Sequence, residues 1–379
     1  MSKKPKKKGK FWKIFRRILC VLLILGLAGG GYWYYAFEYR ASHEVETERT
    51  TTSTEPLYTE EEHEKTVSRN KVMASYLADG TAAETSYVIP GLEATRTLKI
   101  RTTGTPDMCT SMTPQGLAVT EDYLLISAYC RTKEHNSVIY VLDKETHEFI
   151  KEIVLNTRAH VGGMAYDTMN HNLWVSGQGS TWAQANAISL EHLEEYQFED
   201  GYEPLEYDMS YNLYRIKRSS FMTYHDGALF VGFFTQDEAS IIEKYLINAD
   251  GTLYEKTDMN LKRTVGVIDP VACAVSMQVI SGRVQGMAFF DNKILLTRSY
   301  SFLPSEVQVF NYSRYGILQG SEAYKAMRFP ERLEQIYQDG DYIYALFESA
   351  AYSYRMSSFN RIDRVIRLDG SGLVSPYRP

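Results

Sequence analysis

Polar residues recur at matching positions of five similar segments, and their side chains are the ones suited to chemistry. Each segment consists of two short apolar runs separated by a turn. When the segments are aligned, the first runs begin at Gln115, Gly162, Ser220, Gln285 and Glu334, and the second runs end at Tyr129, Gln178, Phe234, Ser299 and Glu348. Amides, aromatic rings and carboxylates that converge in one place suit the binding of a polar molecule such as a sugar or a peptide.

Charged side chains in adjacent loops extend this set. The predicted ligand-binding residues are Gln115, Tyr129, Arg131, His160, Gln178, Gln285, Arg298, Glu334 and Glu348. The alternative is that these groups only satisfy backbone hydrogen bonds at strand ends, which is the usual role of buried polar side chains.

The elements that must position these residues are predicted to be β-hairpins. Asp, Asn, His and Gly occupy the turns, at 121–122, 170–172, 225–227, 291–292 and 339–340, and they tolerate the backbone of a tight turn. A third strand-like run follows each hairpin. Four strands per unit, repeated about every 50 residues, predict an all-β chain folded as a single β-propeller. Five blades are favoured and six are the runner-up, while a β-sandwich is the competing fold. We expect the run 95–102 to complete the last blade and close the ring.

Two stretches of this repeat resemble a known family. Val138–Ile150 reads VIYVLDKETHEFI, and Met164–Ser176 contains a Met-Ala-Tyr-Asp step followed by Leu-Trp-Val-Ser. Both are similar to the repeats of bacterial YVTN-type and NHL-type propellers, and the likeness is best over 110–180 and 284–310. The resemblance implies the fold and not an activity, because propellers carry many unrelated functions.

An enzyme is the less favoured interpretation. Lactonase-like propellers hold calcium with Glu, Asn and Asp from different blades, and here only Glu334 and Glu348 are available. The prediction is therefore that no residue binds a metal and that no cofactor is needed, with calcium reserved for the enzyme alternative. His160 and Glu348 would be its acid–base pair. No nucleophile elbow, zinc-protease helix motif or phosphate loop occurs.

Two of the four cysteines flank the first hairpin. Cys109 precedes its first strand and Cys130 ends its second, so antiparallel pairing would bring them close enough for a disulfide. Two unpaired thiols are the equal alternative, because connectivity does not follow from sequence.

The amino terminus determines the expected topology. Residues 1–17 carry nine Lys and Arg and no acid, and the next twenty residues, 18–37, carry no charge and end in an aromatic cluster. Such a span crosses about 30 Å of hydrocarbon. Basic residues before it and acidic residues after it predict a cytoplasmic tail, a transmembrane signal anchor and an extracytoplasmic body. The alternative is a cleaved signal peptide.

The remainder of the chain divides into two parts. Residues 38–86 are rich in Ser, Thr and Glu and are predicted to be a disordered stalk, although 63–79 has some helical spacing. Residues 87–379 are predicted to be the propeller. Without the basic tail the chain has 32 Lys+Arg against 47 Asp+Glu, a net charge of −15, which argues against nucleic-acid binding and predicts a body that stands off the membrane.

Together these features predict a single-pass protein of the cell membrane. Its propeller is expected to bind a surface glycan, a peptide or a protein through the polar mouth of the central channel. The alternatives are a lactonase-like surface hydrolase with a cation in the channel, and a pure protein scaffold.

Overall fold

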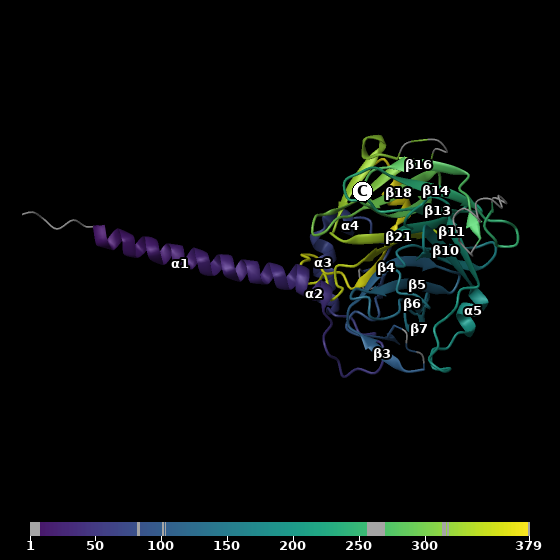
Figure 1. Ribbon diagram of the computed structural model, residues 1–379. Helices are drawn as coiled ribbons and strands as arrows, with labels where there is room; N and C mark the ends of the chain where they lie inside the picture. Colours follow the sequence, from purple (N-terminus) through teal and green to yellow (C-terminus); the bar gives the residue numbers. More distant parts are fainter. Residues whose placement is uncertain are drawn as a thin grey trace, which may run out of the picture.

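A computed structural model describes residues 8–81, 84–100, 102, 104–255, 270–312, 316 and 318–377. The predicted basic tail therefore lies partly outside the described residues. The amino-terminal helix begins as α1 (Lys8–Trp33) and continues through a π-helical turn, η1 (Tyr34–Tyr39), into α2 (Arg40–Ser42). Within it, Phe11–Ser42 is long and apolar enough to cross a membrane. Figure 1 shows this helix projecting from the propeller.

The end of this helix packs against the propeller. Tyr32 Oη donates a hydrogen bond to Met356 O at 2.7 Å. Arg40 is buried, and its Nε donates to Tyr352 O at 2.8 Å while the guanidinium lies 3.7 Å from the centre of the Tyr352 ring. A desolvated cation over an aromatic face adds to the attraction of the hydrogen bond. The helix also contacts a second loop, where the ring of Phe37 lies edge-on to that of Phe302 at 6.1 Å between centres.

The segment predicted to be a disordered stalk is ordered against the propeller, and that prediction is wrong. It contains α3 (Glu60–Arg69) and α4 (Lys71–Ala74), the first with a capping box formed by Thr59 and Glu62. The inward faces of these helices bury Val67 and Met73 in the core of the fourth and fifth blades. The overall composition of the segment concealed these few apolar residues, which find their partners on the propeller.

The described strands form a ring of five blades, which confirms the favoured count (Figure 1). Each blade is given from its innermost strand outward: the first consists of β4 (Met112–Val119), β5 (Tyr123–Cys130), β6 (Val138–Asp143) and β7 (Phe149–Val154), and the second of β8 (Met164–Asp167), β9 (Asn172–Gln178), β10 (Ala183–Ser189) and β11 (Met209–Leu213), to which β15 (Val271–Ala272) is added in parallel. The third blade consists of β12 (Phe221–His225), β13 (Ala228–Gly232), β14 (Ser240–Leu246) and β16 (Ser276–Ile280), and the fourth of β17 (Val284–Phe290), β18 (Lys293–Arg298), β19 (Ser305–Asn311) and β20 (Lys325–Phe329). The fifth blade consists of β21 (Leu333–Asp339), β22 (Tyr342–Phe347), β23 (Arg364–Asp369) and β1 (Ser86–Val88).

The strand that closes the ring is not the predicted one. β1 pairs antiparallel with β23 and so completes the fifth blade from the amino-terminal side of the propeller. The run expected to do this forms instead β2 (Thr95–Leu98), which pairs with β3 (Pro106–Cys109) in a separate two-stranded sheet. In the part of the chain that the structure describes, the remaining short elements are α5 (Leu190–Glu195), η2 (Gly320–Glu322) and α7 (Gly370–Val374).

The repeated Gly-Leu/Met-Ala motif is explained by the crowding of the innermost strands. A Cβ atom on Gly163 would lie 2.6 Å from Met222 N in the next blade, so only glycine fits there. A serine within the second strand links neighbouring blades. Ser127 Oγ accepts a hydrogen bond from Gly116 N at 2.9 Å and donates one to Val161 O, which precedes the next blade, at 2.6 Å. The motif therefore sets the spacing of the blades around the axis.

Candidate functional site

A cavity of about 890 Å³ opens at the end of the propeller where the innermost strands begin. This volume is within the range of small-molecule binding sites. The lining comes from at least four blades and the loops between them, and it consists of Gln115, Tyr129, Arg131, Lys133, Thr157, Arg158, Ala159, His160, Val161, Ser176, Gly177, Gln178, Arg218, Ser219, Ser220, Phe234, Gln285, Glu334, Glu348 and Tyr354.

Local irregularities of the strands present three of these residues to the cavity. The antiparallel register shifts around Gln115 in β4, around Gln285 in β17 and around Glu334 in β21. A β-bulge leaves one residue outside the ladder and redirects its side chain, and bulges often occur beside binding sites. The same position of three blades therefore supplies a polar group to one place.

A buried pair of carboxyl groups forms part of the cavity wall. Glu334 and Glu348 are hydrogen-bonded to each other, and the pKa of each is raised by burial. Gln115 Nε2 donates to Glu348 Oε2 at 2.8 Å, and Arg332 Nη1 lies 3.5 Å from Glu348 Oε1. These two contacts favour the ionised form of Glu348. The proton of the pair therefore resides on Glu334, whose pKa is raised further by the charge of Glu348.

Gln335 lies next to this pair and joins the innermost strands across the axis. Its Oε1 accepts hydrogen bonds from Leu117 N at 3.0 Å and from Met164 N at 3.3 Å. Its Nε2 donates to Met164 O at 2.8 Å and to Met222 O at 3.0 Å. One fully buried side chain from β21 thus binds β4, β8 and β12 at once. Gln335 is outside the cavity lining and holds the innermost strands together next to the carboxyl pair.

An aromatic and cationic cluster forms another wall. The rings of Tyr129 and His160 lie 4.3 Å apart between centres, and Arg131 Nη1 donates to Tyr129 Oη at 3.4 Å. Burial raises the pKa of Tyr129 to about 12. The side chain of His160 lines the cavity and is exposed there, although protein surrounds it at a greater distance. That enclosure, with the charges of Arg131 and Lys133, lowers its pKa to about 4. Tyrosine and histidine are therefore both neutral near pH 7.

The charged side chains that line the cavity are mostly basic, whereas the chain without its basic tail has a net negative charge. Four cations line the cavity, namely Arg131, Lys133, Arg158 and Arg218, whereas its only acids are the two members of the carboxyl pair. Among the described residues, Arg131 Nε has no hydrogen-bond partner although it is buried. The cavity therefore offers positive charge to a negatively charged group.

The structure places eight of the nine predicted ligand-binding residues in this lining, and Arg298 is the exception. Arg298 ends β18, and its side chain turns away from the axis. Its Nε donates to Gly282 O at 3.0 Å and its Nη1 to Glu306 Oε2 on β19 at 3.1 Å. Both contacts lie within the fourth blade and its preceding loop, so Arg298 has a structural role.

Sequence reasoning missed Gln335 and Tyr354. A signal for Gln335 existed, because this glutamine stands where the aligned copies carry Gly116, Gly163 and Gly286. The third copy carries Phe221 there, so Gln335 is the one polar side chain at this position of the five copies. Tyr354 belongs to the loop after β22 and has no counterpart in the other copies.

The two cysteines predicted to form a disulfide lie together as free thiols. Cys109 ends β3 and Cys130 ends β5, and both are buried. Their sulfur atoms lie within 4.8 Å of each other and of ligand atoms of Glu44 and His135. Sequence reasoning, which predicts that no residue binds a metal, did not identify this group of four side chains.

No family model and no curated protein matches the chain. Solved structures with a similar fold include a glutaminyl cyclase of Myxococcus xanthus, with 11% identity, a TM-score of 0.39 and coverage of 69% of this chain and 92% of that chain. A periplasmic gluconolactonase of Pseudomonas aeruginosa has 16% identity, a TM-score of 0.35 and coverage of 60% and 61%. The WD40 β-propeller domain of Doa1 has 8% identity, a TM-score of 0.31 and coverage of 62% of each chain. At these scores the solved neighbours are similar to this chain as β-propeller proteins, and no activity follows from the likeness.

Proposed function

We propose that this chain is a membrane-anchored binding protein whose axial cavity takes a small anionic polar ligand, namely an acidic sugar or a peptide with a free carboxylate. The observation that carries the proposal is the cavity of about 890 Å³ whose lining combines four cations with buried amides and a protonated carboxyl group. An acidic body with a local basic cavity concentrates anions there and repels them elsewhere.

Each wall has a chemical task in this proposal. Arg131 holds the anionic group of the ligand, because it lines the cavity and Tyr129 accepts a hydrogen bond from its guanidinium. Gln285 and the carboxyl group of Glu334 exchange hydrogen bonds with ligand hydroxyls or amides. Phe234 supplies an apolar face against which a sugar ring or a side chain packs.

The proposed setting is the outer face of the cell membrane, with α1 as the anchor and the basic tail inside. The loop after β22 supports a connection between anchor and cavity. Within this loop Tyr354 lines the cavity, while Tyr352 and Met356 contact the end of the helix. A ligand would thus bind beside the point where the chain leaves the membrane.

A surface hydrolase of the lactonase type is the second candidate, because Glu334 and Glu348 share a proton. Two coupled carboxyl groups of which one is protonated can act as general acid and general base. Arg332 already supplies a positive charge beside Glu348, so this candidate does not depend on calcium in the channel.

A pair of conservative substitutions separates the two candidates. Glu334→Gln and Glu348→Gln keep the shape of the cavity and remove the transferable proton. In the binding protein these variants retain ligand with affinity changed by about tenfold or less, since glutamine has the size of glutamate and still forms hydrogen bonds. In a hydrolase, turnover of a panel of lactones and esters would fall by about 100-fold or more. Detectable turnover by the natural chain that is lost in both variants would reject the binding proposal.

A further inference from the structure

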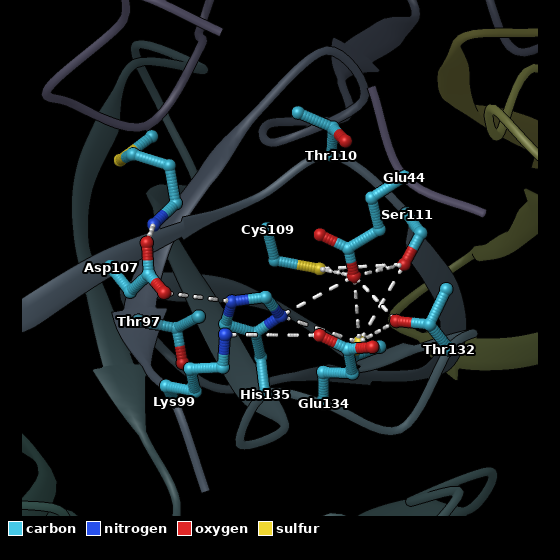
Figure 2. A network of polar contacts seen from close by, with 12 residues as sticks. Glu44, Thr97, Lys99, Asp107, Cys109, Thr110, Ser111, Thr132, Glu134 and His135 are labelled. Carbon is cyan, nitrogen blue, oxygen red and sulfur yellow. Dashed lines mark hydrogen bonds and ion pairs between the residues drawn. The ribbon is translucent and has the colours of Figure 1, made fainter. Parts of the chain in front are cut away.

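Four side chains with metal-binding atoms converge outside the axial cavity, where the chain leaves the helix and meets the first blade. They are Glu44 from the segment after α2, Cys109 from the end of β3, Cys130 from the end of β5, and His135 from the loop after β5. Figure 2 shows Glu44, Cys109 and His135 turned toward a common point. Cys109, Cys130 and His135 are buried and Glu44 is half-buried, so this is an enclosed site and not a surface cluster of acids.

Four of the six distances between the ligand atoms match the edges of a coordination tetrahedron, and the other two, from Cys109 to Cys130 and to His135, lie within 4.8 Å. With Zn–S of about 2.3 Å and Zn–N or Zn–O of about 2.0–2.1 Å, a tetrahedral site has sulfur-to-nitrogen and sulfur-to-oxygen edges of about 3.5 Å and nitrogen-to-oxygen edges of about 3.3 Å. His135 Nδ1 lies 3.3 Å from Glu44 Oε1 and 3.6 Å from Cys130 Sγ. Glu44 Oε1 lies 3.3 Å from Cys130 Sγ and 3.6 Å from Cys109 Sγ.

The groups around the four side chains are those that usually orient metal ligands. His135 Nε2, on the side of the ring away from the cluster, lies 3.4 Å from Asp107 Oδ2, as in the carboxylate–histidine arrangement of zinc sites (Figure 2). Two hydroxyl groups hold the glutamate. Ser111 Oγ donates to Glu44 Oε1 at 2.9 Å and Thr132 Oγ1 donates to the same oxygen at 2.5 Å.

We propose that Glu44, Cys109, Cys130 and His135 bind one Zn²⁺ ion. Two sulfurs, one imidazole nitrogen and one carboxylate oxygen in a tetrahedron select zinc over calcium or magnesium, which require oxygen ligands. Four protein ligands leave no open position, so the site is structural. Two thiol protons leave to solvent when the ion binds, and the ion with two thiolates and one carboxylate carries a net charge of −1.

The proposed ion fastens the end of the membrane helix to the propeller. Glu44 follows α2 by one residue, and the neighbouring Val45 already exchanges two hydrogen bonds of 2.9 Å with Thr110. An ion bound by Glu44 together with the cysteines and the histidine makes this junction rigid. It holds the propeller in one orientation relative to the helix, independently of any ligand in the axial cavity.

The test measures zinc in the full chain, purified in detergent under reducing conditions without chelator. Elemental analysis and native mass spectrometry are expected to find one zinc per chain, with all four cysteines reactive after denaturation. Cys130→Ser and His135→Ala are expected to lower bound zinc at least tenfold at a fixed free zinc concentration. Asp107→Asn should weaken affinity by about 10- to 100-fold, as is typical for partners of ligating histidines.

Matched controls are Cys273→Ser and His192→Ala, which change the same residue types outside the cluster and should retain one zinc per chain. Replacement by Co²⁺ gives a second readout on the unmutated chain, because a tetrahedral thiolate site shows intense visible bands and charge-transfer absorption. A Cys109–Cys130 disulfide in the chain isolated from membranes would overturn the proposal. So would free thiols without zinc, or zinc that persists in Cys130→Ser.

Discussion

The side-chain amide of Gln115 donates a hydrogen bond of 2.8 Å to the carboxylate of Glu348, and this bond joins the first blade to the last. The two residues are 233 positions apart in the sequence. Both also line the axial cavity, so the groups that close the ring are the groups that a ligand meets. Substitutions in the cavity must therefore be read on two scales, the free energy of unfolding and the affinity for ligand.

Gln335→Ala is expected to destabilise the propeller by about 2–4 kcal/mol. The change removes four hydrogen bonds to Leu117, Met164 and Met222 and leaves buried backbone groups without partners, each of which is costly. Denaturant unfolding of the two chains measures the difference. Gln338→Ala is the matched control, because Gln338 is a half-buried glutamine of the same strand that bonds only its own turn. Equal stability of Gln335→Ala and the natural chain would show that Gln335 does not hold the blades.

Glu334→Gln is expected to alter the pH dependence of stability. Burial, followed by the charge of Glu348, raises the pKa of Glu334 well above 4.5, so the native state binds this proton more tightly than the unfolded state. Stabilisation from the protonated group is complete below about pH 4.5 and is lost as the pH rises through the raised pKa. The natural chain should therefore lose stability as the pH rises from about 4.5 through the raised pKa, relative to Glu334→Gln, whose amide cannot ionise.

The measurement is the unfolding free energy of both chains across that pH range, with the exposed Glu64→Gln as control. A difference between the natural chain and Glu334→Gln that stays constant with pH would contradict the shared proton. A difference that grows toward low pH would have the wrong sign for a buried neutral carboxyl group.

Gly163→Ala is expected to destabilise the ring by about 1–3 kcal/mol through overpacking. The added methyl group would lie 2.6 Å from Met222 N and 2.7 Å from Phe221 C, which are backbone atoms of the next blade and cannot rotate away. Gly227→Asn provides the comparison, since nothing lies within 4 Å of a Cβ there and asparagine accepts the positive φ of this turn. Thermal unfolding should separate the two variants, and similar midpoints would argue against close packing at the axis.

Met73→Ala is expected to loosen the segment between the helix and the propeller. Met73 is fully buried against the fourth and fifth blades, and loss of such a side chain costs about 2–5 kcal/mol of packing. Limited trypsin digestion, followed by mass analysis of cuts between residues 49 and 71, should show faster cleavage. The adjacent Val72→Ala changes a residue that is 40% exposed and should cleave like the natural chain. Rapid cleavage of the unmutated chain would support a disordered stalk instead.

The sequence predicts the five hairpins because each carries its own local signal, a turn followed by an apolar run of fixed length. The strand that closes the ring has no such signal. β1 is a three-residue strand whose pairing depends on β23, nearly 280 positions away, whereas the run 95–102 has a stronger β pattern and a different partner. Similarly, Val67 and Met73 are isolated apolar residues in a polar segment, and only the tertiary contact gives them a core.

The axial site follows from alignment of the repeats, because equivalent positions of a propeller meet at its axis. Residues outside the repeat have no equivalent positions, so the alignment does not place them. Tyr354 reaches the cavity from a loop unique to the last blade, and Glu44 joins Cys130 from a segment judged by its composition alone. His135 lies in a loop that only the three-dimensional arrangement of the first blade brings to Glu44.

The most direct test of the central claim is ligand capture by the full chain on arrays of acidic and neutral glycans and of peptides with free carboxylates. The account predicts an anionic ligand whose affinity falls at least tenfold in Arg131→Gln and stays unchanged in Arg298→Gln, the arginine that faces away from the cavity. A ligand bound equally by both variants, or arrays that retain no anionic compound, would contradict the assignment of the axial cavity as the binding site.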